Sequence, residues 1–249
     1  MEKNTHQFPT EEVTLPSKGL LYPEDSPLRS GKIEMKYMTA REEDILTNQN
    51  YIEDGTVIDK LLQSLIVTPV KYDDLLVGDK NAILIAARIL GYGKDYTFEY
   101  NNESITIDLT DIEDKTIDKS MITNGENKFH YTLPTSKKDI TFKFLTHKDE
   151  KAVANELKGI KKINKDASPE LSTRMKYLIT SVEGDSTTKT IREFVDQQLL
   201  AIDSRQLRNH ISSIQPDVNL THKYEDKRGD FKTINIPLGI NFFWPDVEL

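Results

Sequence analysis

The chain has 249 residues, enough for one large domain or two small ones. Acidic residues outnumber basic residues by 41 to 33, and the net charge of −8 argues against generic binding to nucleic acid. Cysteine is absent, which excludes disulfides, thiolate zinc sites and a cysteine nucleophile. No apolar stretch approaches the ~20 residues that span a bilayer, and the first residues lack the apolar region of a secretory signal, so we expect a soluble, mostly intracellular protein.

Residues 1–30 are predicted to form an extended N-terminal arm. Residues 1–16 are polar, contain two prolines and have no hydrophobic period. The turn that follows carries the apolar side chains of Leu20, Leu21 and Tyr22 outside any periodic element. Because the polar residues beside them offer little local support, we expect these side chains to dock on a partner.

A strand and three helices are predicted next. Apolar and charged residues alternate over 32–37, which is typical of a half-buried strand. Thr39 and Glu42 have the spacing of a capping box, which predicts that a short helix begins there. Apolar residues at helical spacing predict a second helix from residue 56 and a third, largely apolar helix over 79–90.

Two hairpins follow in the middle of the chain. Strands are predicted over 96–100 and 105–109, joined by the polar tip Asn101–Ser104. A second pair of strands is predicted over 129–133 and 140–145.

The C-terminal part is predicted to be mainly helical and to end in a hairpin. Start signals such as Ser-Pro-Glu and Thr-x-x-Glu precede apolar residues at helical spacing. Helices are predicted over 147–164, 169–182, 190–202 and 203–214, and strands over 218–224 and 231–238.

These elements predict an α+β fold in which helical segments pack with small antiparallel β-hairpins. We divide the chain into the arm (1–30), an α+β domain (31–146) and a helical domain that ends in a β-hairpin (147–249). Both halves pair a helical segment with a hairpin, over 79–109 and 188–238, which raises the hypothesis of a distant internal duplication. The alternative is that a helix followed by a hairpin is simply a common arrangement.

The residue types that catalysis or metal binding needs do not occur in a recognisable pattern. No two of the five histidines have the i, i+4 spacing of a helical metal site, and the sequence has neither a P-loop nor a nucleophile elbow. The carboxylate clusters lack the spacing of a calcium loop. We therefore expect no enzymatic activity, no metal and no cofactor. The lysines of the 147–165 helix are a candidate for nucleic-acid contact, but a solvated face is the preferred interpretation because the chain is acidic.

Aromatic side chains also gather near the C-terminus, where Phe242, Phe243 and Trp244 follow one another. Large aromatic residues are typical anchors of protein interfaces. Together with Leu20–Tyr22, they are the candidate partner-binding residues. The alternative is that they complete the core of their own domain.

Several runs of the sequence resemble one family of bacteriophage proteins, the baseplate hub assembly proteins of T-even-type contractile-tailed phages and related tail proteins. The similarity touches both ends of the chain. The runs at the N-terminal end are Pro16–Pro23, Gly31–Glu34 and Met38–Leu46, and those at the C-terminal end are Asp203–Arg208, Pro216–Val218 and Phe242–Asp246.

Relatives in that family often carry Cys-x-x-Cys pairs at hairpin tips, like small zinc ribbons. The matching places here are Asn101–Ser104 and Glu225–Asp230, and neither contains cysteine. The resemblance therefore implies zinc-ribbon-like hairpins that have lost the metal and are held by strand pairing.

The resemblance implies a non-enzymatic protein that builds or forms part of the central hub of a phage baseplate through protein–protein contacts. A tail assembly chaperone that is absent from the mature virion is the alternative, and a hydrolase that uses a carboxylate cluster is a third hypothesis. The implied partners are other baseplate or tail proteins or further copies of this chain, with neither nucleic acid nor a membrane among them. The implied location is the host cytoplasm during assembly and, for a retained component, the tail baseplate of the virion.

Overall fold

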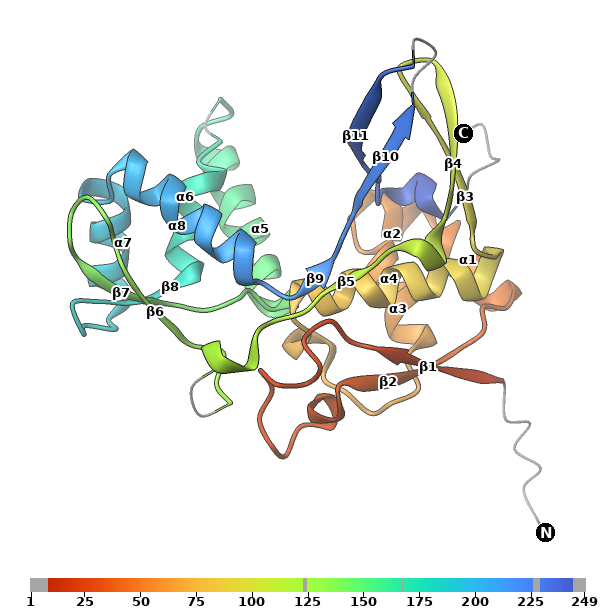
Figure 1. Ribbon diagram of the computed structural model, residues 1–249, viewed down its shortest axis with the longest axis horizontal. Helices are drawn as coiled ribbons and strands as arrows, with labels where there is room; N and C mark the ends of the chain where they lie inside the picture. The colour runs from red at the N-terminus through yellow and green to blue at the C-terminus, as the bar shows by residue number, and fades with distance from the viewer. Residues whose placement is uncertain (1–8, 123–124, 167, 226–228, 244–249) are drawn as a thin grey trace.

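Helices and small antiparallel sheets form two lobes, which confirms the predicted α+β class (Figure 1). The computed structural model describes residues 9–122, 125–166, 168–225 and 229–243. The sheets in these ranges have two or three strands each, so the core lies mainly between helices and the inner faces of hairpins.

The first lobe contains what we call the first unit, residues 10–108, in which a hairpin, a group of helices and a second hairpin follow one another. Its elements are β1 (Thr10–Thr14), η1 (Pro27–Ser30), β2 (Lys32–Lys36), α1 (Ala40–Leu46), α2 (Gln49–Glu53), α3 (Val57–Leu65), η2 (Tyr72–Asp74), α4 (Val77–Tyr92), β3 (Asp95–Tyr100) and β4 (Glu103–Asp108).

What we call the second unit, residues 129–235, forms the second lobe and then returns to the first. Its elements are β6 (Phe129–Thr132), β7 (Asp139–Phe142), α5 (His147–Ile163), α6 (Glu170–Leu178), β8 (Ile179–Val182), α7 (Thr188–Gln197), α8 (Ala201–Ile214), β9 (Asp217–Val218), β10 (Thr221–Glu225) and β11 (Phe231–Asn235). The connection between the units contains η3 (Leu109–Asp111), β5 (Asp114–Lys115), which pairs with β9, and η4 (Lys119–Met121), and η5 (Ile240–Phe242) follows β11.

The two units share one order of elements. In each, an antiparallel hairpin leads into a helix. A later helix is followed directly by an isoleucine that pairs with the hairpin, and a long helix precedes a second hairpin. Met35 pairs with Ile66 in the first unit, as Phe142 pairs with Ile179 in the second. The repeat is therefore longer than the one expected from the sequence, because it starts at the first strand of each half.

The helix after the first hairpin begins in the same way in both units. Thr39 and Glu42 form the predicted capping box before α1, and α5 has the same box with Asp149 in place of Glu42. A lysine of the preceding strand also pairs with each carboxylate, at 2.8 Å for Lys36 with Glu42 and 2.8 Å for Lys143 with Asp149. Burial alone would raise the pKa of Glu42, but its hydrogen bonds outweigh burial and hold the pKa at about 2.

The predicted N-terminal arm is instead part of the first lobe over its described residues. Thr10–Thr14 pairs with Lys32–Lys36 as strands β1 and β2. Leu15 and Leu28, which lie between these strands, are fully buried. The arm prediction is thus wrong from residue 10 onward, and residues 1–8 lie outside the described residues.

The boundary between the lobes also differs from the predicted one at residue 146. Strands β6 and β7 pair with β8 and belong to the second lobe. The last hairpin, β10–β11, lies beside β3–β4 of the first unit, where the rings of Tyr100 and Tyr224 meet edge-on at 5.9 Å (Figure 1). The C-terminal segment is therefore shared between the two lobes.

Candidate functional site

The N-terminal candidate residues for partner binding lie in the core of the first unit. Leu21 and Tyr22 are 4 % and 3 % exposed, and Leu20 is partly buried against the same core. The Tyr22 hydroxyl donates to Asp79 Oδ2 at 2.6 Å, while the N–H and hydroxyl of Ser17 donate to the same carboxylate at 2.9 and 2.7 Å. This corrects the expected docking role, because Leu21 and Tyr22 are not at the surface.

The Asp79 carboxylate holds this loop from the first turn of α4, where it is fully buried. Burial raises the pKa of Asp79, although the hydrogen bonds from Tyr22 and Ser17 act in the opposite direction. Burial and the neighbouring Asp79 charge likewise raise the pKa of Tyr22, so its hydroxyl stays protonated and donates. The Leu76 N–H completes the group by donating to the Tyr22 oxygen at 2.9 Å.

The C-terminal candidate residues also fill the core of the first unit. Phe242 and Phe243 are fully buried, and Phe242 meets the ring of Tyr96 edge-on at 4.8 Å. Its carbonyl accepts a hydrogen bond from Arg88 Nε at 2.9 Å. The two phenylalanines therefore support the alternative of a role in the chain's own core, while Trp244 lies outside the described residues.

The second unit has a counterpart of the Asp79 loop tether. Asp203 occupies the same position in the first turn of α8 and accepts hydrogen bonds from the N–H groups of Thr135 and Ser136 at 2.8 and 2.9 Å. Burial raises the pKa of Asp203, but these donors outweigh burial and lower it. Sequence analysis placed Asp203 at the helix cap, so its role as a loop tether was missed.

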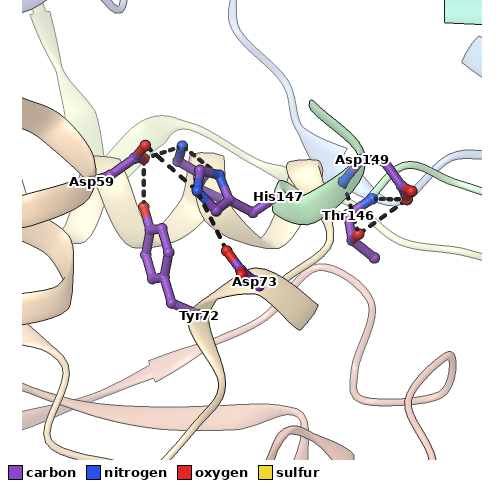
Figure 2. Close-up of polar contacts among 7 residues, drawn as sticks. Asp59, Tyr72, Asp73, Thr146, His147 and Asp149 are labelled. Atoms are coloured by element: carbon purple, nitrogen blue, oxygen red, sulfur yellow. Dashed lines mark hydrogen bonds and ion pairs between the residues drawn. The ribbon is translucent and has the colours of Figure 1, made fainter. Parts of the chain in front are cut away.

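The strongest cluster of titratable side chains lies where the two units meet (Figure 2). His147, the first residue of α5, is buried against Tyr72, with ring centroids 4.7 Å apart. Its Nε2 lies 3.5 Å from Asp59 and 3.9 Å from Asp73, and its Nδ1 lies 3.3 Å from the Lys80 ammonium. Figure 2 shows the imidazole between the two aspartates of the first unit.

In the first unit this cluster contains two aspartates and one lysine, and the lysine pairs with one of the aspartates. Lys80 pairs with Asp59, which also accepts a hydrogen bond from the Tyr72 hydroxyl at 2.9 Å. Burial and the adjacent Lys80 charge lower the pKa of His147, so the imidazole is neutral at pH 7. Burial and Asp59 raise the pKa of Tyr72, so its phenol stays protonated.

This arrangement suits a junction better than a reaction centre. The Tyr72 phenol stays protonated while it donates to Asp59, and the His147 side chain is only 8 % exposed. The backbone on either side of His147 joins the two units as well, since the His147 N–H donates to the Leu75 carbonyl at 2.8 Å and the Val77 N–H donates to the Leu145 carbonyl at 3.1 Å. We therefore define the unit junction as the contact of residues 145–147 with residues 75–77.

A cleft of about 1030 Å³ opens beside the unit junction. The loop 21–29 forms one wall, and residues 125–127 together with Thr146 form another. Arg29 closes the loop from within by donating to the carbonyls of Leu20 and Tyr22 at 2.9 and 3.3 Å. Arg29 is thus engaged in holding the backbone of the cleft wall.

The His147 side chain makes the stability of the chain depend on pH. The pKa of His147 in the folded chain lies below the usual value of about 6.5. Below about pH 6.5 unfolding therefore takes up a proton. The contribution of His147 to the free energy of unfolding is complete above this pH and is lost as the solution becomes more acidic. His147→Gln should therefore reduce the loss of unfolding free energy between about pH 7 and pH 5. Urea unfolding at several pH values measures this.

His210→Gln is the matched control, because burial also lowers the pKa of His210, which lies away from the unit junction and stacks on Tyr131. The two variants should each remove part of the acid sensitivity. An unchanged pH profile in His147→Gln would contradict the assigned state of the imidazole.

The described residues hold no group of three or more histidine, aspartate or glutamate side chains that could bind a metal ion. In the same ranges no helix is long and apolar enough to cross a membrane. No protein-family model, curated protein or solved structure significantly matches this chain.

Proposed function

We propose that this chain is a non-enzymatic phage tail protein that builds, or forms part of, the central hub of a baseplate through protein–protein contacts. The observation that carries the proposal is where the family-like runs fall in the fold. Pro16–Pro23 holds Ser17 and Tyr22 on Asp79, Met38–Leu46 contains the capping box of α1, and Asp203–Arg208 starts with the second loop tether. A likeness concentrated on residues that fix the fold supports a shared scaffold, and the function is proposed from that scaffold by analogy.

The chemistry of the unit junction agrees with a role in assembly. Lys80 pairs with Asp59, which also accepts from the Tyr72 hydroxyl, and the buried His147 of the second unit lies beside these first-unit groups. Surface complementarity, and not bond chemistry, is the property such an arrangement supports.

Exposed apolar side chains offer contact surface outside the core. Ile163 is 91 %, Phe231 80 % and Ile202 54 % exposed. Exposed apolar groups on a polar surface mark sites of protein–protein contact when they lie in patches. These three lie on three different elements, α5, β11 and α8, and each is a single candidate contact point.

A phage that lacks the gene for this chain tests the proposal. We expect such a phage to yield few infectious particles and to accumulate tails without complete baseplate hubs, as seen by electron microscopy, and a plasmid copy of the gene should restore both. Mass spectrometry of purified virions then separates the two roles, because a hub component is present in the particle and an assembly chaperone is absent. Normal titres and complete baseplates without the chain would contradict the proposal.

A further inference from the structure

The unit junction uses different surfaces of the two units. On the first unit, the junction surface is the start of α4, where Leu76 forms an antiparallel bridge with Thr146 of the second unit. Residue 216 adds to this contact, since a Cβ placed on Gly78 would lie 2.0 Å from the Pro216 carbonyl oxygen. The first unit therefore offers the start of its long helix, and the second unit offers the start of α5 and the end of α8.

The second unit has a surface in the position that corresponds to the start of α4, with Ile202 where α4 has Gly78, so the close approach of residue 216 has no counterpart there. We call this surface the α8 edge, Leu199–Ile202, which corresponds to Leu75–Gly78. Leu76 is 2 % exposed because the unit junction covers it, whereas its counterpart Leu200 is 45 % exposed and the adjacent Ile202 is 54 % exposed. Within the described residues, the Leu199 carbonyl and the Ala201 N–H form no hydrogen bond.

The first unit likewise has a copy of the segment that covers α4. This is the Met38–Ala40 segment, which corresponds to Leu145–His147 in its place at a capped helix start and shares the capping threonine, but has alanine where His147 stands. Ala40 is exposed, and its N–H and the Met38 carbonyl have no hydrogen-bond partner in the part of the chain that the structure describes. Met38 also lies beside Gly91, near the end of α4. In the second unit, the junction surface likewise includes residues 145–147 and the residues that follow the end of α8.

These two surfaces cannot meet within one chain. The α8 edge lies in the second lobe and the Met38–Ala40 segment lies in the first, and the exposure of Leu200 shows that they are apart (Figure 1). An interface made from two different surfaces leaves one unused surface of each kind at the two ends of a pair. Each chain therefore has two unused surfaces, and each corresponds to one side of the contact that already joins its two units.

We propose that a second copy of this chain occupies the α8 edge, with its Met38–Ala40 segment adding to the backbone of Leu199–Ala201 as Leu145–His147 adds to Leu75–Val77. The Ala201 N–H then donates to the Met38 carbonyl, and the Ala40 N–H donates to the Leu199 carbonyl. Leu200 and Ile202 leave water in the same step, which favours association. The contact is head-to-tail, so it extends to longer assemblies or closes into a ring. It does not rest on the proposed function.

Sedimentation velocity of the full chain over about 1–100 μM tests the proposal, since weak specific interfaces are populated in this range. We expect the average mass of the native chain to rise with concentration. Ile202→Glu places a charge on the α8 edge, and Ala40→Glu places a charge on the Met38–Ala40 segment. Both substitutions put an acid in the first turn of a helix, where it complements the helix dipole and the fold is retained. Each variant alone should remain a monomer, because every contact needs both surfaces.

An equimolar mixture of the two variants gives the sharpest result. Ala40→Glu retains an intact α8 edge and Ile202→Glu retains an intact Met38–Ala40 segment, so the mixture should form pairs and nothing larger. Ile163→Glu, which changes a 91 % exposed side chain at the end of α5, should associate like the native chain. A native chain that stays monomeric throughout, association of either variant alone, or a mixture that forms no pairs would overturn the proposal.

Discussion

Replacing Asp79 with alanine should lower the free energy of unfolding by about 3 kcal/mol or more, because buried donors without an acceptor cost about 1–3 kcal/mol each. Three donors depend on this carboxylate: the N–H and hydroxyl of Ser17 and the hydroxyl of Tyr22. The loop that carries Leu21 would lose its tether to α4 as well. Urea unfolding of Asp79→Ala against the native chain measures the loss.

Two matched variants identify the cause of that loss. Asp79→Asn keeps a hydrogen-bond acceptor and removes a buried carboxylate, whose pKa is raised by burial. Its loss of unfolding free energy should therefore be clearly smaller than that of Asp79→Ala. Asp203→Ala removes two N–H bonds at the counterpart position, where the Thr135 and Ser136 donors are only part-buried and water can replace the carboxylate. Its cost should be about 1–2 kcal/mol. Equal losses in Asp79→Ala and Asp203→Ala would contradict the assigned difference between the two tethers.

Phe242→Ala should destabilise the chain by about 3–5 kcal/mol, the usual cost of emptying a buried phenylalanine site. The ring is fully buried and packs edge-on against Tyr96 and Phe243, so the cavity has no side that can easily collapse. Thermal and urea unfolding both report this loss.

Phe231→Ala serves as the control for the C-terminal phenylalanine, since that ring is 80 % exposed on β11. It should change the stability by no more than about 0.5 kcal/mol. A Phe242→Ala chain with native stability but impaired assembly would restore the original partner-binding interpretation of Phe242.

Regular elements were predictable because their signals are local. The helix over 79–90 and the hairpin 96–100 with 105–109 correspond to α4 (Val77–Tyr92) and β3–β4 (Asp95–Asp108), since hydrophobic spacing and a polar tip lie within a few residues of one another. The helix predicted over 169–182 ends earlier, at Leu178, where the chain becomes strand β8. Its isoleucine and valine side chains fit either interpretation, and pairing with a distant strand decides between them.

Segments whose structure depends on distant partners could not be predicted. Strand β1 has the polar sequence Thr10–Thr14, four of whose five residues are exposed, and it is ordered by backbone pairing with β2. The loop around Tyr22 has no period, because Asp79, nearly sixty residues away, positions its side chains. The absence of local support predicts an extended arm for the first segment and an exposed turn for the second, but tertiary contacts hold both in the first lobe.

The two related helix starts could have been found by comparing the sequence with itself. Lys36-Tyr37-Met38-Thr39 and Lys143-Phe144-Leu145-Thr146 match at every position in residue type. Such a match predicts two related caps, but it does not predict which copy covers the other unit. That choice depends on the packing of α4 against the second lobe.

The hydrogen bond from Arg88 to the Phe242 carbonyl joins residues 154 positions apart, and this separation bears on how the protein is made. At roughly 5–20 residues per second, a ribosome adds the last aromatic residues of the first core about 8–30 s after Arg88. For most of that interval the helix Val77–Tyr92 has been synthesised without the ring that closes its surroundings. The lobe that is translated first is therefore expected to be the one completed last, when the C-terminal segment arrives.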